Sequence, residues 1–143
     1  MRHAEGLCRE RGVRLTEQRR RVLRAVCAAE RPVGAYDILE AIRAEVPRVA
    51  PPTVYRALEF LLEQGLVHKL ETLHAYVSCD HPEHPHASQF LICTACGDVT
   101  EIADEAISDS LGQAAAATGF RPARGVVEVT GTCADCAGED EGE

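Results

Sequence analysis

Two Cys-x-x-Cys pairs constrain this chain more than any other feature, because they must meet in space if they bind one ion. The first is Cys93 with Cys96, and the second, Cys133 with Cys136, follows after a gap that can hold a helix. Four thiolates in two such pairs form a closed tetrahedral zinc site, with Zn–S distances of about 2.3 Å. A redox dithiol would need one pair only. The spacing therefore predicts a structural zinc site of Cys93, Cys96, Cys133 and Cys136.

Length and cysteine usage agree with this prediction. A chain of 143 residues can bury one ordinary core, or two small ones if metal stabilises the smaller. It contains no apolar run near the roughly 18–20 residues that span a bilayer, and its first residues lack the apolar segment of a signal peptide. We therefore expect a cytoplasmic protein, in whose reducing surroundings Cys-x-x-Cys pairs are metal ligands or redox thiols rather than disulfides.

The net charge of −8 is unevenly distributed. Residues 1–70 carry 13 Arg and Lys against 9 Asp and Glu, a net charge of +4, whereas residues 71–143 carry 2 against 14, a net charge of −12. A positive N-terminal half is compatible with DNA phosphates, and the acidic half would be repelled by them. Charge alone leaves open that both sets are merely solvated surface.

The N-terminal half reads as helices followed by a hairpin. A short helix stopped by Gly12 is expected over about 3–11, and apolar residues at helical spacing predict helices over about 17–29, 35–46 and 51–64. Strands are expected over 66–70 and 75–79. This order is that of a winged helix-turn-helix. Cys8 and Cys27 are expected to be structural residues of these helices, with Cys27 in the core.

The fourth helix has a defined outer face. Val54, Leu58 and Leu61 mark its buried side, and a rotation of about 100° per residue places Tyr55 and Arg56 outward near its N-terminus. An Arg fork and an aromatic ring at this place suit a helix that reads the major groove. Surface Tyr and Arg are common, so the pair alone does not separate DNA contact from solvated surface.

The C-terminal half reads as a small α/β domain. Strands are expected over 89–93, 98–102 and 126–130, with a helix over 103–118 between the last two. The predicted fold is therefore α+β. It has a winged helix-turn-helix over 1–79, a small metal-binding domain over 87–137, and a disordered acidic tail over 138–143.

Further metal donors gather near the hinge. They are His68, Cys79, Asp80, His81, Glu83, His84, His86 and Glu101. A Cys, two His and one carboxylate would close a second four-coordinate site, and a thiolate favours zinc over harder ions. The alternatives are a polar surface loop and, for His68, a hydrogen-bonded core residue.

Several motifs together resemble the ferric uptake regulator (Fur) superfamily, and within it the zinc uptake regulator (Zur) branch. The similarity runs through nearly the whole chain. It includes Arg14-Leu15-Thr16-Glu17-Gln18-Arg19, Ala35-Tyr36-Asp37, Pro51-Pro52-Thr53-Val54-Tyr55-Arg56-Ala57-Leu58, Leu61-Leu62-Glu63-Gln64-Gly65 and both cysteine pairs.

The resemblance implies a homodimer that binds palindromic operator DNA when zinc is bound and represses zinc-uptake genes. It makes residues 1–79 the DNA-binding domain, residues at about 78–86 a hinge, and residues 87–137 the dimerisation and metal-binding domain. It implies two zinc ions per subunit, one structural and one regulatory. The positions that match the sensing site are His68, Cys79, His86 and Glu101, and those that match DNA contacts are Tyr36, Thr53, Tyr55 and Arg56.

Other interpretations remain open at this point. Iron sensors of the superfamily carry a later His near the last strand, where this chain reads Arg124-Gly125-Val126, so an extra metal site at His81 or His84 is an open question. Sensors of iron, nickel or manganese are the nearest alternative. A zinc hydrolase with Glu101 as general base and a zinc-ribbon adaptor that senses nothing are the others.

Overall fold

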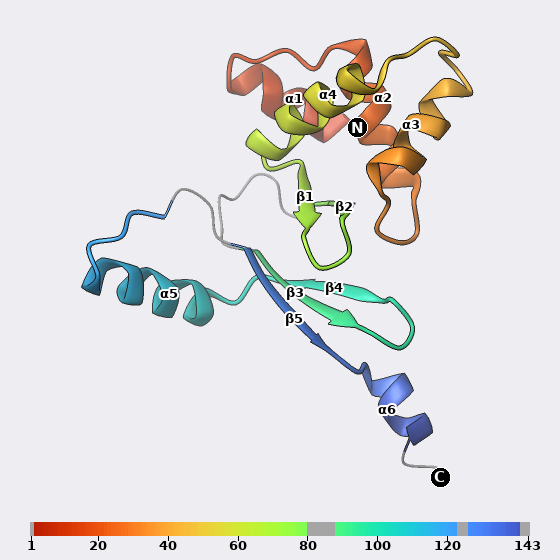
Figure 1. The fold of residues 1–143 in the computed structure, drawn as a ribbon. Coiled ribbons are helices and arrows are strands. Elements are labelled where there is room, and N and C mark those ends of the chain that lie inside the picture. The colour runs from red at the N-terminus through yellow and green to blue at the C-terminus, as the bar shows by residue number, and fades with distance from the viewer. Residues whose placement is uncertain (1, 80–87, 123–125, 141–143) are drawn as a thin grey trace. The chain divides into compact units, whose positions relative to one another are not determined.

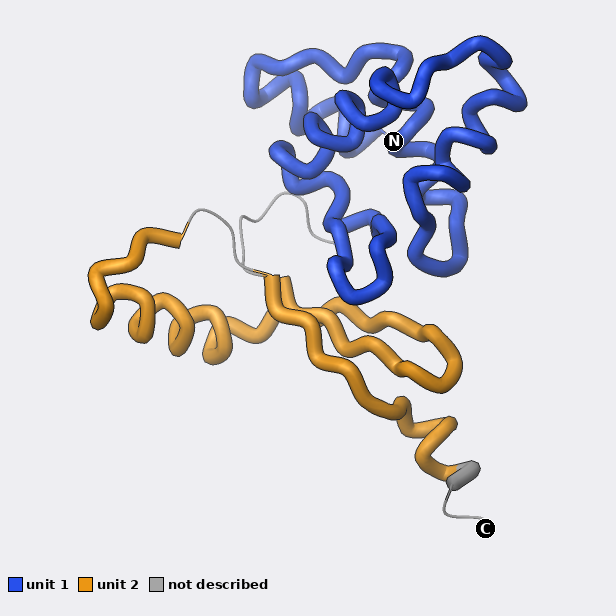
Figure 2. Tube along the Cα trace, in the orientation of Figure 1, with its two compact units in different colours: residues 1–84 blue, residues 85–143 orange. Residues whose placement is uncertain are grey.

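The computed structural model describes residues 2–79, 88–122 and 126–140 (Figure 1). The chain divides into two compact units, Met1–His84 and Pro85–Glu143, which are described separately below (Figure 2). Each unit contains both helices and strands, which confirms the predicted α+β class. None of the described helices is both long enough and apolar enough to cross a membrane.

The first unit contains four helices and a hairpin, in the order that the sequence predicts. Their bounds are α1 Arg2–Glu10, α2 Glu17–Ala28, α3 Ala35–Arg43, α4 Pro51–Glu63, β1 Val67–Leu70 and β2 Ala75–Ser78.

Local signals explain where these helices begin and end. Thr16 caps α2, because its hydroxyl accepts a hydrogen bond from the Arg19 N–H at 3.4 Å. Pro51 stands in the first turn of α4, where a missing N–H costs nothing. Gly65 follows α4 with φ +69°, a left-handed conformation that ends the helix and turns the chain into β1.

The hairpin forms the wing of this unit. Strands β1 and β2 pair antiparallel, with His68 opposite Val77 and Leu70 opposite Ala75. An isolated bridge between Val33 and Tyr76 attaches the segment before α3 to the outer side of β2. The wing is thereby connected to the helices by backbone hydrogen bonds as well as by packing.

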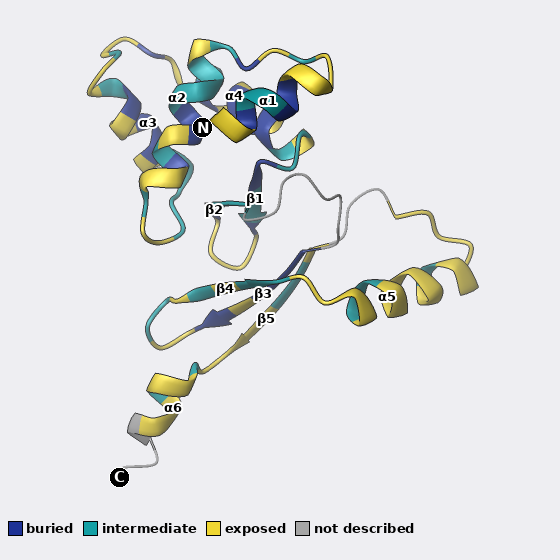
Figure 3. Cartoon of the chain, turned by 180° about the vertical axis from the view of Figure 1, so that it is seen from behind, coloured by how far each residue is buried: buried dark blue, intermediate teal, exposed yellow. Residues whose placement is uncertain are grey.

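The helices enclose one hydrophobic core. Each contributes the apolar stripe that its sequence predicts, including Val22 and Val26 from α2, and Leu58 and Leu61 from α4. Figure 3 shows that buried residues alternate with exposed ones along these helices. Such burial is the main source of stability for a domain of this size.

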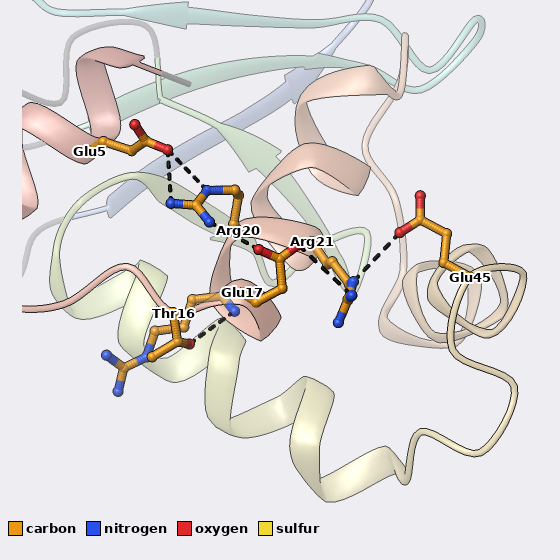
Figure 4. Close-up of polar contacts among 7 residues, drawn as sticks. Glu5, Thr16, Glu17, Arg20, Arg21 and Glu45 are labelled. Carbon is orange, nitrogen blue, oxygen red and sulfur yellow. Dashed lines mark hydrogen bonds and ion pairs between the residues drawn. The ribbon is translucent and has the colours of Figure 1, made fainter.

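Charged side chains connect α1, α2 and the turn that follows α3 around the core (Figure 4). The Arg20 guanidinium contacts Glu5 at 2.8 Å and Glu17 at 3.0 Å. Arg21 contacts Glu17 at 3.8 Å and Glu45 at 3.6 Å. These groups are partly exposed, so each pair contributes modestly, and their role is to fix how the helices meet.

The second unit is a three-stranded sheet with two helices. Strand β3 Ser88–Cys93 lies in the centre, antiparallel to β4 Val99–Ile102 and parallel to β5 Val126–Gly131. Helix α5 Glu105–Ala117 forms part of the connection between the parallel strands, and α6 Ala134–Asp140 follows β5. All residues of α5 are described, and none of them is buried within the single chain (Figure 3).

The structure corrects three expectations. Cys27 is exposed rather than in the core, because it lies past the stripe of Val22, Leu23 and Val26 at the end of α2, whereas Cys8 is buried. Helix α3 ends at Arg43, before the predicted end at 46. Helix α6 was not predicted, and it includes residues 138–140 of the expected tail.

The core of the first unit predicts a strong dependence on Leu61, whose side chain is fully buried. We expect Leu61→Ala to lower the free energy of unfolding by about 2–5 kcal/mol, because a cavity is left in α4's packing. Leu73→Ala, in the wing turn where the residue is 38% exposed, is the matched control and should change it by less than about 0.5 kcal/mol. Denaturant unfolding followed by helical circular dichroism measures both, and similar losses for the two variants would contradict this assignment of the core.

Candidate metal centres and nucleic-acid interface

Four cysteine side chains meet in the second unit. The sulfur atoms of Cys93, Cys96, Cys133 and Cys136 all lie within 4.8 Å of one another, with Cys96 and Cys133 at 3.8 Å. These separations suit four thiolates around one tetrahedral ion, for which Zn–S distances are about 2.3 Å. The donors are soft and complete the coordination of zinc, so the residues present fit a closed structural site.

Backbone geometry builds this cluster from two turns. Gly97 has φ +80° and donates its N–H to the Cys93 carbonyl at 2.9 Å, which brings Cys96 back over Cys93. The second pair is brought to the first by the end of β5, since the Thr94 N–H donates to the Gly131 carbonyl at 2.9 Å. Parallel pairing of β3 with β5 places Cys93 opposite Gly131, two residues before Cys133.

The electrostatics of the cluster also favour a cation. Hydrogen bonds from the backbone N–H groups of Cys133 and then Cys96 lower the pKa of the Cys93 thiol to about 6. The side chain of Cys133 raises the pKa of Cys136 far above its ordinary value, because a proton is shared between adjacent sulfurs. A divalent cation would supply the positive charge that allows all four sulfurs to ionise.

His68 and Cys79 are brought together in the first unit. Cys79 stands two residues beyond Val77, the direct partner of His68, and such diagonal positions share one face of an antiparallel pair. Their ligand atoms lie within 4.8 Å of each other, and both residues are half-buried. The Cys79 N–H donates to the Leu66 carbonyl at 3.1 Å, which continues the hairpin to this residue.

Of the other predicted donors, one lies in the described part of the second unit. Glu101 lies on β4, half-buried and opposite Phe90 of β3. His81, His84 and His86 lie outside the described residues. Two of the four predicted ligands of the sensing site are therefore adjacent in one unit, and the complete set remains a prediction.

The predicted DNA contacts lie at the starts of α3 and α4. Tyr36 is 70% exposed and Tyr55 is 54% exposed, so both rings are accessible to a partner. Arg56 is also exposed, and Thr53 is half-buried in the first turn of α4. Arg56 is on the helix face away from Val54 and Leu58, as the periodicity predicts.

Arg19 has a role that the sequence pattern did not reveal. Its guanidinium carbon lies 3.7 Å from the centroid of the Phe60 ring, and its Nη1 donates to the Arg14 carbonyl at 2.6 Å. This arginine therefore holds the segment before α2 against α4. The Arg19 guanidinium is therefore engaged in contacts within the protein.

Comparison with known proteins defines the class to which this fold and these sites belong. The model of the ferric uptake regulator family matches residues 10–130. The chain belongs to the ferric uptake regulator family. This is a family of transcriptional regulators, and that membership excludes the interpretation of the chain as a zinc hydrolase.

Within this family, the chain is similar to zinc uptake regulators. The chain is 46% identical over 134 residues to the zinc uptake regulation protein of Escherichia coli (strain K12), covering 93% of this chain and 78% of that protein. A solved structure of a zinc uptake regulator complexed with zinc and DNA matches with a TM-score of 0.89 and 44% identity, over 97% of this chain and 93% of that one. The crystal structure of holo XcZur matches with a TM-score of 0.87 and 46% identity, over 96% of each chain.

The geometry of the cysteine cluster predicts the effect of removing one ligand. We expect Cys96→Ser to lose about one zinc per chain and to unfold at a lower temperature, because the binding energy of a structural zinc contributes directly to folding. Cys27→Ser is the matched control, since Cys27 is exposed and lies outside the cluster. Metal analysis of the purified proteins and thermal unfolding measure both effects, and an unchanged zinc content in Cys96→Ser would refute the site.

Proposed function

We propose that this protein is a zinc-responsive transcriptional repressor that acts in the cytoplasm as a homodimer on palindromic operator DNA. The observation that carries the proposal is the likeness over 97% of the chain to a zinc uptake regulator complexed with zinc and DNA, in a chain that also presents four clustered thiols. The genes it controls are then those of zinc uptake, as in the relative from Escherichia coli.

Two zinc ions per subunit serve different purposes in this proposal. The ion held by Cys93, Cys96, Cys133 and Cys136 is permanent and structural. The regulatory ion is held by His68, Cys79, His86 and Glu101. The adjacency of His68 and Cys79 supports this second set, and the thiolate of Cys79 favours zinc over iron or manganese.

The regulatory ion acts by joining ligands that come from different parts of the chain. His68 and Cys79 come from the wing hairpin, and Glu101 comes from the sheet of the second unit. One ion bound by all of them restricts the hinge to the arrangement that can engage DNA. To move such an equilibrium from 1:99 to 99:1, zinc must favour the competent arrangement by about 5.5 kcal/mol, which is reasonable for a four-ligand site.

The DNA is read by α4 of each subunit. Tyr55 and Arg56 enter the major groove, with Tyr36 and Thr53 beside them, and the two half-sites lie roughly one helical turn or a multiple apart. The surplus of positive charge in residues 1–70 supports this orientation, since the acidic remainder is repelled by phosphate.

Zinc titration tests the regulatory site. We expect Cys79→Ser to need a free zinc concentration more than about 100-fold higher for half-maximal operator binding. Removing a residue that only hydrogen-bonds to a metal ligand already lowers metal affinity by about 10–100-fold, and here a ligand itself is lost. Fluorescence anisotropy with labelled operator at fixed salt and buffered zinc provides the measurement, with Cys27→Ser as the control. Wild-type binding that does not depend on zinc would overturn the proposal, and a preference for iron, nickel or manganese at equal free concentration would favour a sensor of that metal.

The recognition helix gives a second test. We expect Arg56→Ala to weaken operator binding by about 1–3 kcal/mol, roughly 5- to 150-fold, because a base or phosphate contact is lost. Arg121→Ala removes the same charge from an exposed position in the second unit and should leave the affinity within about twofold, since long-range charge is screened. Equal weakening by the two variants would show that only net charge matters and that α4 does not read the DNA.

A further inference from the structure

Gln89 is a buried amide near the start of β3, where Ser88 is the other buried polar residue of the strand. Its side chain is 1% exposed, and Phe90 and Ile92 of the same strand β3 are buried as well. A buried amide without partners costs free energy, so buried amides are hydrogen-bonded to something specific. The partners of Gln89 therefore indicate what the residue is for.

Both ends of this amide bind the beginning of α5. The Gln89 Nε2 donates to the Ser108 Oγ at 3.1 Å, and the Gln89 Oε1 accepts from the Asp104 N–H at 2.8 Å. Asp104 is the N-cap of α5, and its carboxylate accepts from the Ala106 N–H at 2.9 Å and from the Ile107 N–H at 3.4 Å.

The bond from the Asp104 N–H to Gln89 takes the place of a capping bond within α5. In a capping box, a Glu or Gln at the third helical position accepts from the N–H of the N-cap residue. That position here is Ile107, which has no acceptor. Gln89 supplies the acceptor from the central strand instead, so the start of α5 is defined by the sheet rather than by the helix's own sequence.

The same corner carries the predicted zinc ligand of the second unit. Gln89 is directly opposite Ile102 in β4, the residue after Glu101, and Ala103 alone separates Ile102 from Asp104. Helix α5 buries none of its residues within the single chain, so side-chain packing does little to fix this corner. The hydrogen bonds of Gln89 hold β4 and α5 in one geometry.

We propose that Gln89 is a positioning residue for the regulatory zinc, which fixes the corner between Glu101 and α5 and so couples zinc binding to the order of α5. This inference rests on the proposed function. Because coupling is reciprocal, zinc binding also orders the first turn of α5, and loosening that turn weakens zinc binding. Gln89 contacts neither the zinc nor Glu101's metal-binding oxygens in this scheme, and it acts through the strand that carries Glu101.

The test compares Gln89→Leu with two other variants in the full-length protein. Leucine fills a similar volume and removes both hydrogen bonds, whereas Ser108→Ala removes the bond from Nε2 only. Gln18→Leu makes the same chemical change in α2 of the first unit and is the control. Zinc affinity of the regulatory site is measured by chelator competition, its ligand geometry by the Co²⁺ absorption spectrum, and the order of residues 104–108 by amide hydrogen exchange with and without zinc.

We expect Gln89→Leu to retain the structural zinc, to bind the regulatory zinc about tenfold more weakly and to lose the zinc-dependent protection of residues 104–108, with Ser108→Ala intermediate. A changed Co²⁺ spectrum in Gln89→Leu separates positioning from a general loss of stability, which would leave the ligand geometry of the folded protein unchanged. Zinc affinity and Co²⁺ spectrum equal to those of the wild type would overturn the inference.

Two further outcomes are decisive as well. If Gln89→Leu loses its structural zinc, Ser108→Ala decides, since a weaker regulatory site in that folded variant supports the inference and an unchanged one overturns it. A wild-type protein that binds one zinc per chain overturns the proposed function and this inference together. Two zincs in the wild type with an unaffected Gln89→Leu overturn the inference alone.

Discussion

Convergence of four thiols on one point organises the second unit of this protein. The described residues of Pro85–Glu143 bury few side chains, chiefly those of β3, and α5 buries none. A domain of this size with so small a core usually requires a staple. The two cysteine pairs join the turn after β3 to the end of β5, so a metal there would close the sheet at one end.

The first unit needs no such support, and its physical character is different. Its helices share a continuous apolar core, and partly exposed ion pairs and the Arg19–Phe60 contact fix how they meet. Tyr36 and Tyr55 lie outside this core, with their rings exposed. A unit with such a core has its fold fixed by its own packing, so the exposed rings are not needed for that packing.

Periodicity and spacing made most of this architecture predictable. Helical stripes located α2 to α4, and the spacing of the paired Cys-x-x-Cys motifs alone identified the four-thiol cluster. The failures have local causes. Cys27 was assigned to a stripe that ends one residue earlier, and α6 carries no apolar periodicity in its short span. Gln89 could not be recognised, because its importance arises from partners on another element. The full ligand set of the regulatory site stays a prediction, since His86 lies outside the described residues.

The binding free energy of zinc would serve a different purpose at each of the two proposed sites in this chain. At the four cysteines, binding contributes to folding, because the segment that carries them has little core of its own. At His68 and Cys79 the hairpin is already formed by β1–β2 pairing and by the Cys79 N–H bond to Leu66, so little of the binding energy is needed to fold it. Under the proposed function, that energy would be available to restrict the hinge and to order the corner that Gln89 holds. A site whose ligands are preformed on a folded element can therefore act as a switch, whereas one that builds its own domain can act only as a staple.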